Sequence, residues 1–392
     1  MKNSNNSNEP SKTHYDYIIT GAGCAGSSLL MRMMSDVFFH DKSILVIDHS
    51  AKNNDDRTWC FWEKENGIFE DIVAHQWSYA QFLSTTFSSR LPLSPYKYKM
   101  IRSADLYRSV RERSRSFPNI EWLQEAVVSV DSHEGKARVQ LPSAEISSDY
   151  VFNSILFEYP ANKTGHYFFW QHFTGWFIRT TQPAFDPGLA TLMDFTVEQN
   201  GGTSFMYVLP LSSHTALVEY TVFSESLLEA EMYERILKEY ISSRLQVKEY
   251  TITHAENGKI PMTSMPFPMH KDRVINIGVA GGDIKPSSGY AFQFIQKRTE
   301  AIVSTLQTTG KPYAKKTAAK FRLYDNILLR VLQKKLMSGD VLFAGIFQKN
   351  PPERILCFLD NESSLLQDLS IMRSVPSRVF LPAAFHVLKK WL

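Results

Sequence analysis

The sequence predicts an α/β protein with a βαβ unit near its N-terminus, a strand-rich middle and a helical C-terminal region. Three observations lead there. A strand, a glycine-rich turn, a helix and a second strand follow one another within residues 15–48. Short strand-like runs fill the middle of the chain, and residues from 318 onward look helical. With 392 residues the chain exceeds one typical domain, so we expect two domains or one discontinuous one.

Composition excludes several classes of protein. The 43 basic and 40 acidic residues nearly balance, so the protein has no strong overall electrostatic field that would attract nucleic acid. The three cysteines are too few for a disulfide framework or a structural zinc site, which favours a reducing cytosol. No apolar run approaches the ~18 residues of a spanning helix. Residues 1–13 are polar, unlike a signal peptide, and are expected to be a disordered tail.

The first unit reads as strand 15–20, a turn, a helix over about 27–34, and strand 44–47. Its turn is Gly21-Ala22-Gly23-Cys24-Ala25-Gly26, the spacing of a dinucleotide-binding turn. Gly21 permits the tight turn, Gly23 lets the backbone approach a pyrophosphate, and Gly26 lets helix and strand pack closely. The helix N-terminus would face the phosphates. Asp48 ends the second strand, where it can accept hydrogen bonds from an adenosine ribose.

The rest of the chain is predicted from periodicity and composition. Residues 55–118 alternate aromatic residues with polar loops and include a basic helix over 106–115. Residues 226–244 read as an amphipathic helix and residues 250–269 as extended. Further strands are expected at 127–130, 137–141, 150–157, 176–181, 203–209 and 215–222.

A second glycine-rich turn spans Gly278 to Tyr290, between a predicted strand over 274–279 and a predicted helix over 291–306. Its backbone could reach a flavin, and an ordinary strand-to-helix loop is the alternative. The first turn alone does not decide between FAD and NAD. Its position at the N-terminus, together with this late turn, favours FAD.

Beyond the glycine turn, six segments follow one another in a distinctive order. They are Asp55–Trp62, Ile101–Tyr107, Leu192–Val197, Phe205–Leu211, Leu217–Thr221 and Pro286–Tyr290. Taken together, they resemble the lycopene β-cyclases of carotenoid-making bacteria, and the resemblance covers about residues 14–300.

The resemblance implies a flavoprotein fold shared with aromatic hydroxylases and geranylgeranyl reductases. It places an FAD-binding domain at 14–75, 100–160 and 270–310, a substrate domain at 76–99 and 161–269, and a helical region at 311–392. It implies cyclisation of the ψ-ends of lycopene to β-ionone rings, with reduced FAD as a non-redox cofactor and NAD(P)H as the reductant. The expected cofactor-binding residues are Gly21, Gly23, Cys24, Ala25, Gly26, Asp48, Arg102, Gly281, Gly282, Pro286, Ser287 and Gly289.

The chemistry needs an acid, because ring closure begins by protonating an alkene. A carboxyl among apolar residues has a raised pKa and can serve as that acid. Glu219, in the acidic motif, is the candidate for acid, base or both, against the alternative of a solvated strand carboxylate. The motif's second acidic position is Tyr220, so Glu219 must act alone or with another partner. Asp194 is the second candidate, as charge partner or relay, against a turn or cap role.

Other positions carry weaker expectations. Gly278 is followed by Val279, where many such flavoproteins have Asp, and Asp283 is a possible substitute. Arg57 is expected either to lie near the flavin or to have a structural role, packed among the neighbouring aromatic residues. His166 and His172 are read as structural, and no metal site is expected.

The aromatic content, 26 Phe, 17 Tyr and 7 Trp, suits a bulky core or a site for a large apolar molecule. We expect Trp59, Phe61, Trp62 and the run Phe168–Trp170 to line such a site. Because lycopene dissolves in membranes, the protein is expected to be cytoplasmic and peripherally attached to the inner face of the membrane. The candidate contacts are Phe385, Val387, Leu388, Lys389, Lys390, Trp391 and Leu392, with an ordinary C-terminal helix as the alternative.

Two other functions stay open at this point. One is a redox flavoprotein of the same architecture, such as a monooxygenase or a polyprenyl reductase. The other is a pigment- or flavin-binding protein without turnover. The oligomeric state is not predicted.

Overall fold

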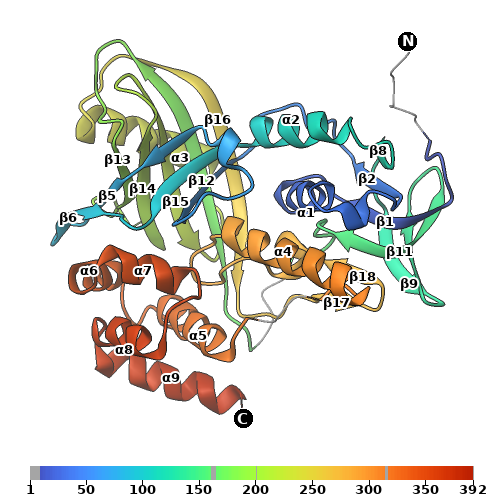
Figure 1. The fold of residues 1–392 in the computed structure, drawn as a ribbon. Helices are drawn as coiled ribbons and strands as arrows, with labels where there is room; N and C mark the ends of the chain where they lie inside the picture. Colours follow the sequence, from blue (N-terminus) through green and yellow to red (C-terminus); the bar gives the residue numbers. More distant parts are fainter. Residues whose placement is uncertain (1–8, 160–164, 200, 314–316, 392) are drawn as a thin grey trace.

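The computed structural model describes residues 9–159, 165–199, 201–313 and 317–391. Two large sheets lie at opposite ends of the molecule, and a helical C-terminal region lies below one of them (Figure 1). Of the predicted tail, residues 1–8 lie outside the described part. Within the remainder, the Ser11 backbone N–H donates to a carboxylate oxygen of Glu121 at 2.8 Å.

The first sheet contains the βαβ unit that the sequence predicts. Five strands run parallel in the order β18-β11-β1-β2-β8, and the hairpin strands β9 and β10 extend it at β11. Every residue of β2 is buried, as expected for a strand covered on both faces. The strands are β1 (His14–Thr20), β2 (Ile44–Asp48), β8 (Ile120–Gln124), β9 (Ser129–His133), β10 (Lys136–Gln140), β11 (Glu145–Asn153), β17 (His270–Lys271) and β18 (Val274–Asn276).

The helices around this sheet are α1 (Cys24–Met34), α2 (Ser103–Ser114) and α4 (Phe292–Thr309). Helix α1 packs against α4 and α2, which fixes the glycine turn at the edge where β1 and β2 end. The predicted strand over 274–279 is shorter in the structure. Its second half is a 3-10 turn, Gly278–Gly281, in which Gly278 has a positive φ of 62°.

The second sheet has seven strands in the order β16-β12-β15-β14-β13-β5-β6. The predicted strand over 176–181 is the end of a much longer strand, because its register continues back to residue 170 with β15 and to residue 168 with β16. The strands are β5 (Tyr79–Leu83), β6 (Ser88–Pro92), β12 (Phe168–Thr180), β13 (Leu189–Asp194), β14 (Thr203–Pro210), β15 (Thr215–Ser224) and β16 (Tyr250–Thr263).

One face of the second sheet is covered by helix α3 (Ala230–Glu239), which continues as one π-helical turn, Tyr240–Arg244. The predicted helix over 226–244 therefore begins four residues late, at 230. Side chains alternate between the two faces of a strand. In β15, Val218, Tyr220 and Val222 pack toward α3, whereas Leu217, Glu219 and Phe223 face the other way.

Residues 55–118, read from sequence as loops and aromatics with one helix, contain five strands. β5 and β6 join the second sheet. A small antiparallel sheet, ordered β3-β7-β4, bridges the two large ones and is built from β3 (Thr58–Glu63), β4 (His75–Trp77) and β7 (Lys97–Arg102). The short strands and the loops between them hid the period-2 pattern.

The C-terminal region is helical, as predicted. Helices α5 and α9 pack together, and the region adjoins the second sheet through α5 and α6. Over the described residues, no helix is both long and apolar enough to cross a bilayer. The helices are α5 (Ala319–Gln333), α6 (Gly339–Lys349), α7 (Pro352–Leu359), α8 (Leu365–Arg373) and α9 (Ser377–Trp391).

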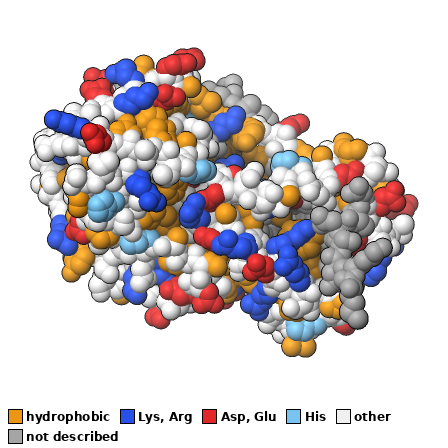
Figure 2. All heavy atoms as spheres, turned by 90° about the horizontal axis from the view of Figure 1, so that it is seen from above, with side chains coloured by type: hydrophobic (Ala, Val, Ile, Leu, Met, Phe, Trp, Pro, Cys, Tyr) orange, Lys and Arg blue, Asp and Glu red, His pale blue; other side chains and the backbone are white. Residues whose placement is uncertain are grey.

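Figure 2 shows the face seen from above, where acidic, basic and apolar side chains are interspersed.

Candidate functional site

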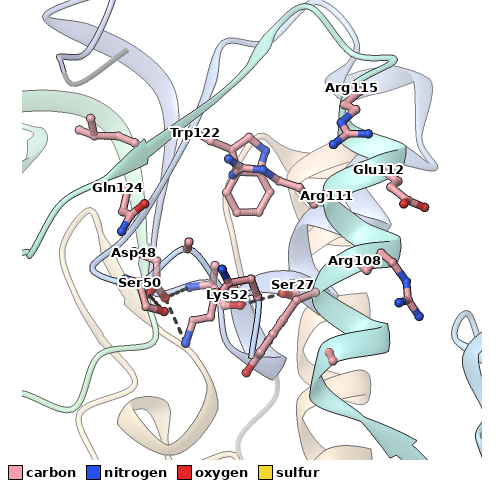
Figure 3. Close-up of a pocket in the computed structure, with 16 residues that line it drawn as sticks. Ser27, Asp48, Ser50, Lys52, Arg108, Arg111, Glu112, Arg115, Trp122 and Gln124 are labelled. Carbon is pink, nitrogen blue, oxygen red and sulfur yellow. Dashed lines mark hydrogen bonds and ion pairs between the residues drawn. The ribbon is translucent and has the colours of Figure 1, made fainter. Parts of the chain in front are cut away.

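Two pockets lie along the edge of the first sheet. The smaller one, about 330 Å³, is lined from β2, α2 and β8 (Figure 3). The larger one, about 710 Å³, extends from α1 past the second glycine turn to the second sheet. Both touch the first glycine turn, the smaller at Ala22 and the larger at Gly23, Cys24 and Ala25.

The first turn has the geometry that a bound phosphate needs. Gly21 has φ +87°, and a side-chain carbon on Gly26 would lie 2.0 Å from the Gly21 carbonyl oxygen, so both positions require glycine. A carbon on Gly23 would meet nothing within 4 Å, because Gly23 faces open space in the larger pocket. Helix α1 starts at Cys24, so its free N–H groups lie beside this opening.

Asp48 lies in the wall of the smaller pocket, at the end of β2, as the sequence predicts. Its carboxylate accepts from the Ala22 backbone N–H at 2.7 Å and from the Ser50 N–H at 2.9 Å. The Lys52 Nζ lies 3.6 Å from Asp48 Oδ2. Asp48 therefore also holds the turn in shape.

Sequence reasoning missed the opposite wall of this pocket. Arg108, Arg111 and Arg115 project from the α2 side, and the Arg111 guanidinium lies 4.3 Å from the centre of the Trp122 ring (Figure 3). Their spacing along the basic helix, three or four residues apart, puts them on one side of it. That spacing is the signal that could have identified them. The arginines give the pocket positive charge.

The second turn meets the larger pocket at fewer points than expected. Gly289 lines the pocket, as do Gly278 and Val279, but Gly281, Gly282, Pro286 and Ser287 do not. Ser287 donates to Asp325 at 2.6 Å, toward the helical region. Gly281 is required by packing, since a side-chain carbon there would lie 2.2 Å from the Asn276 carbonyl oxygen.

Asp283 is committed to the turn itself. It accepts from the Gly278 backbone N–H at 2.7 Å and pairs with the buried Arg298 at 3.3 Å. It does not line the pocket, so it does not replace the missing acidic residue at 279.

Arg57 lines the larger pocket, but Arg102 lines neither pocket. The Arg102 side chain is bound by the Asp55 carboxylate, with its Nε at 2.6 Å, and lies 5.7 Å from the Phe177 ring centre. Its expected contact with a cofactor therefore has no support in this arrangement.

Glu219 lines the far wall of the larger pocket, on the face of β15 turned away from α3. Its carboxylate accepts from the Thr221 hydroxyl at 2.7 Å. Part of the side chain opens on the pocket, yet protein surrounds it closely enough for burial to dominate. Burial, and next the charge of Glu256, raise the pKa of Glu219 to about 8.

Glu256 of β16 is a second carboxylate in the same wall, and sequence reasoning missed it. Gly175 of the central strand β12 pairs with Glu219 on one side and with Glu256 on the other. Glu256 accepts from the Thr58 hydroxyl at 2.8 Å. Burial first, and then the charge of Asp55, raise the pKa of Glu256 to about 7, while Thr58, Arg57 and Arg102 act to lower it. No sequence signal links the two residues, since 36 positions separate them.

Asp194 lies on the other face of this sheet. It accepts from the Tyr240 hydroxyl at 2.7 Å and from the Thr196 N–H at 2.8 Å, and Arg244 lies 3.7 Å away. A direct contact of Asp194 with Glu219 therefore has no support in this arrangement, and its bond with Thr196 suits the alternative turn role. Tyr220 also points to that face and is completely buried there. An acidic residue at 220 would therefore not meet Glu219.

The aromatic lining differs from the one expected. Of the six predicted residues only Trp59 lines the larger pocket, while Phe61, Trp62 and Phe169 are core and Phe168 and Trp170 lie elsewhere. The Tyr207 and Tyr290 hydroxyls lie 3.2 Å apart. The aromatic residues in the lining are Trp59, Tyr98, Tyr107, Tyr159, Phe173, Tyr207, Tyr290 and Phe292.

His172 has a structural position. The Tyr233 hydroxyl lies 2.5 Å from its Nδ1 and the Ser224 hydroxyl 2.7 Å from its Nε2, and burial lowers its pKa to about 4. Within the described ranges, no group of three or more His, Cys, Asp or Glu side chains is placed to hold a metal ion.

Comparison with known sequences gives one family. Residues 16–384 match the model of the family described as "Lycopene cyclase protein". A lycopene beta-cyclase of Pantoea ananas is 26% identical over 294 residues, covering 71% of each chain. A lycopene beta-cyclase of Pseudescherichia vulneris is 24% identical over 312 residues, covering 76% of this chain and 75% of its own.

Solved structures share the fold at low identity. A geranylgeranyl bacteriochlorophyll reductase-like protein of Thermoplasma acidophilum is 11% identical, with a TM-score of 0.60 over 96% of this chain and 99% of its own. A flavoprotein/dehydrogenase of Cytophaga hutchinsonii is 10% identical, with a TM-score of 0.64 over 97% and 100%. The p-nitrophenol 4-monooxygenase of Pseudomonas putida is 12% identical, with a TM-score of 0.59 over 97% and 98%. The fold is therefore that of FAD-dependent monooxygenases and geranylgeranyl reductases with C-terminal helices, which confirms the predicted fold class.

Proposed function

The chain belongs to the lycopene cyclase family, and from that premise we propose that it is a lycopene β-cyclase, which closes the ψ-ends of lycopene into β-ionone rings. The observation that carries the proposal is Glu219: a carboxyl of raised pKa, with no cation bound to it among the contacts of the described residues, in the wall of a large pocket. The two relatives compared above are both named lycopene beta-cyclase, which supports the proposal.

The pockets fit an FAD molecule, as the fold of FAD-dependent enzymes suggests. Gly23 and the α1 N-terminus would take the pyrophosphate, and Asp48 with the α2 arginines the adenosine end. The backbone of Gly278 and Gly289 would meet the flavin side. When bound in reduced form, the electron-rich flavin supplies negative potential beside a cation. NAD(P)H is the proposed reductant.

The chain's own residues supply the proton chemistry. At neutral pH Glu219 holds its proton, because burial and the nearby Glu256 disfavour its ionised form. Its O–H bond breaks as a C–H bond forms at the terminal alkene of lycopene, which leaves a tertiary carbocation. A second double bond attacks that cation and closes the ring. Loss of a ring proton then restores neutrality, so the product is an isomer of the substrate.

The pocket walls stabilise the cation and exclude water. Tyr98, Tyr207 and Tyr290 line the pocket, and aromatic faces attract cations. The pKa values of these three phenols are raised well above neutrality by burial, so they stay uncharged. Cys60 beside them also stays a neutral thiol, since burial raises its pKa. Glu219 and Glu256 are then the groups among these that exchange protons near neutral pH.

The helical C-terminal region is the proposed contact with the membrane that dissolves the substrate. Seven exposed apolar side chains lie at helical spacing on α8 and α9, and the exposed Lys389 and Lys390 lie in the last turn of α9. Val387, expected among the contacts, is buried instead, because it packs against the core. Leu392 lies outside the described residues, as does the Trp391 side chain. The seven are Leu365, Leu366, Leu369, Met372, Leu381, Phe385 and Leu388.

The test is expression in bacteria that accumulate lycopene, followed by chromatography and mass spectrometry of the pigments. A cyclase converts lycopene to γ-carotene or β-carotene at unchanged mass. A product of altered mass would instead identify a redox flavoprotein of the same fold. Unchanged lycopene, with flavin bound and reductant supplied, would contradict the proposal in favour of a binding protein.

A further inference from the structure

We propose that Glu256 is the second catalytic carboxylate of the site and acts as the base that removes the ring proton after Glu219 has delivered its own. This inference rests on the proposed cyclisation and names a residue for its last step. Both carboxylates belong to the same wall of the larger pocket and face the same side of the sheet.

Gly175 is what lets the two side chains approach each other. It lies between them on β12, and a side-chain carbon there would lie 3.4 Å from Glu219 Cβ and 3.4 Å from Glu256 Cγ. The same carbon would come within 2.9 Å of Leu217 Cδ1. A side chain at this position would therefore contact both glutamates and displace Leu217, whereas glycine leaves the space between Glu219 and Glu256 free.

The surroundings differentiate the two groups. Glu219 meets one hydroxyl, from Thr221, and the other titratable side chains near it are Glu256, Cys60, Tyr207 and Tyr290.

Glu256 also meets a hydroxyl, from Thr58, but Arg57 and Arg102 lie near enough to favour its ionised form, against the opposing charge of Asp55. Of two coupled carboxylates in one pocket, the one nearer the cations gives up its proton first. Glu219 is then the protonated member and Glu256 the ionised one, which are the roles of acid and base.

The proposed step balances. Glu219 loses a proton to a substrate carbon, the ring closes by forming one carbon–carbon bond, and Glu256 gains a proton from a ring carbon as the ring double bond forms. The pair ends with its proton on Glu256, and transfer back to Glu219 resets the site. The carbocation can lose a proton from more than one neighbouring carbon, so the position of the base decides which ring isomer is made.

The experiment compares Glu256→Gln and Glu256→Asp with wild type and with Glu249→Gln, an exposed carboxylate just before the same strand. Each full-length protein, loaded with FAD and reduced, is given lycopene in phospholipid vesicles. Turnover per bound flavin, ring isomers and the pH profile are measured. We expect Glu256→Gln to lose about a hundredfold or more in kcat, to shift its residual product away from β-rings, and to lose the acidic limb of the profile.

We expect Glu256→Asp to keep its preference for β-rings, because it retains a carboxylate, and Glu249→Gln to match wild type. Wild-type turnover and products in Glu256→Gln would overturn the inference. So would a loss of turnover that leaves the ring isomers and the pH profile unchanged, since that result marks a structural role. Inactivity of the wild type itself would contradict the proposed function instead. Retained activity in Glu219→Gln would contradict the acid assignment alone.

Discussion

The two faces of the seven-stranded sheet each carry acidic side chains in the protein interior, yet those side chains have different surroundings. On the α3 face, Asp194 is fully buried and accepts from Tyr240 and Thr196, with Arg244 close by. On the pocket face, Glu219 and Glu256 each accept from one hydroxyl, burial raises the pKa of both, and the charge of Glu256 raises that of Glu219 further. Burial alone therefore does not mark a reactive carboxyl. What marks it is burial beside a cavity with one hydroxyl donor and, among the described residues, no ion pair to offset the cost of ionisation.

The largest expected effect is on catalysis at the pocket face. Glu219→Gln removes the acidic proton but keeps the shape of the side chain and one hydrogen-bonding oxygen. We expect turnover of lycopene per bound flavin to fall by about 10²–10⁴-fold or more. Bound flavin is measured by absorbance, with Glu249→Gln as the exposed control. Turnover close to wild type, with flavin bound, would contradict the assignment of the reactive carboxyl to the pocket face of the sheet.

The next effect concerns Tyr220, which occupies an acidic position of the family motif. Tyr220→Asp restores that residue type but places a carboxylate in the apolar cluster against α3. We expect a loss of about 4 kcal/mol or more in stability, because a buried ring is lost and a carboxyl is desolvated. Denaturant unfolding measures it. A gain in turnover would show that position 220 reaches the reacting atoms, contrary to its place in the sheet.

A smaller loss is expected from Asp194→Asn. The amide weakens the hydrogen bonds from Tyr240 and Thr196 and removes the negative charge beside Arg244. We expect about 2 kcal/mol of lost stability, with turnover per bound flavin within about twofold of wild type. Thermal unfolding and the lycopene assay, run on the same preparation, separate the two quantities. A large fall in turnover without a loss of stability would indicate that Asp194 takes part in the reaction.

The smallest effect is a pH dependence of stability. The folded state holds the Glu219 proton up to a pKa of about 8, whereas the unfolded chain releases it near 4.5. Between these values the folded state binds more protons, so this group's contribution to stability falls as the pH rises. Glu219→Gln lacks that dependence. We expect its Tm, relative to wild type, to be higher at pH 8 than at pH 5, by on the order of 2–4 °C, measured by calorimetry without cofactor. If the difference in Tm between Glu219→Gln and wild type were the same at pH 5 and at pH 8, that result would contradict the raised pKa.

The sequence predicted the parts of the molecule whose chemistry is local. The glycine turn, Asp48 and the strand that carries Glu219 are where their spacing and pattern indicated. The same was not possible for Glu256, because its approach to Glu219 depends on two strand registers meeting at Gly175. The place of Asp194 could not be predicted for a related reason: position along the chain does not tell which face of a sheet a residue joins.

Other misses have equally physical causes. The strands between residues 58 and 102 are three to six residues long and separated by loops, which leaves little periodicity to read. In the second turn, Pro286 and Ser287 belong to a recognisable motif, yet Ser287 faces Asp325 rather than the pocket. The aromatic residues that line the pocket come from several separate elements, which proximity in sequence does not reveal.

In the proposed mechanism Glu219 is a protonated acid at neutral pH, and its protonation state is open to direct measurement. Infrared difference spectra of the full-length wild type against Glu219→Gln would detect the carbonyl stretch of a protonated carboxyl as the pH is varied. We predict a band that is present at pH 7, absent from the variant, and lost on titration near a pKa of about 8. The absence of that band at pH 6, with the side chain titrating near its ordinary value, would contradict the account.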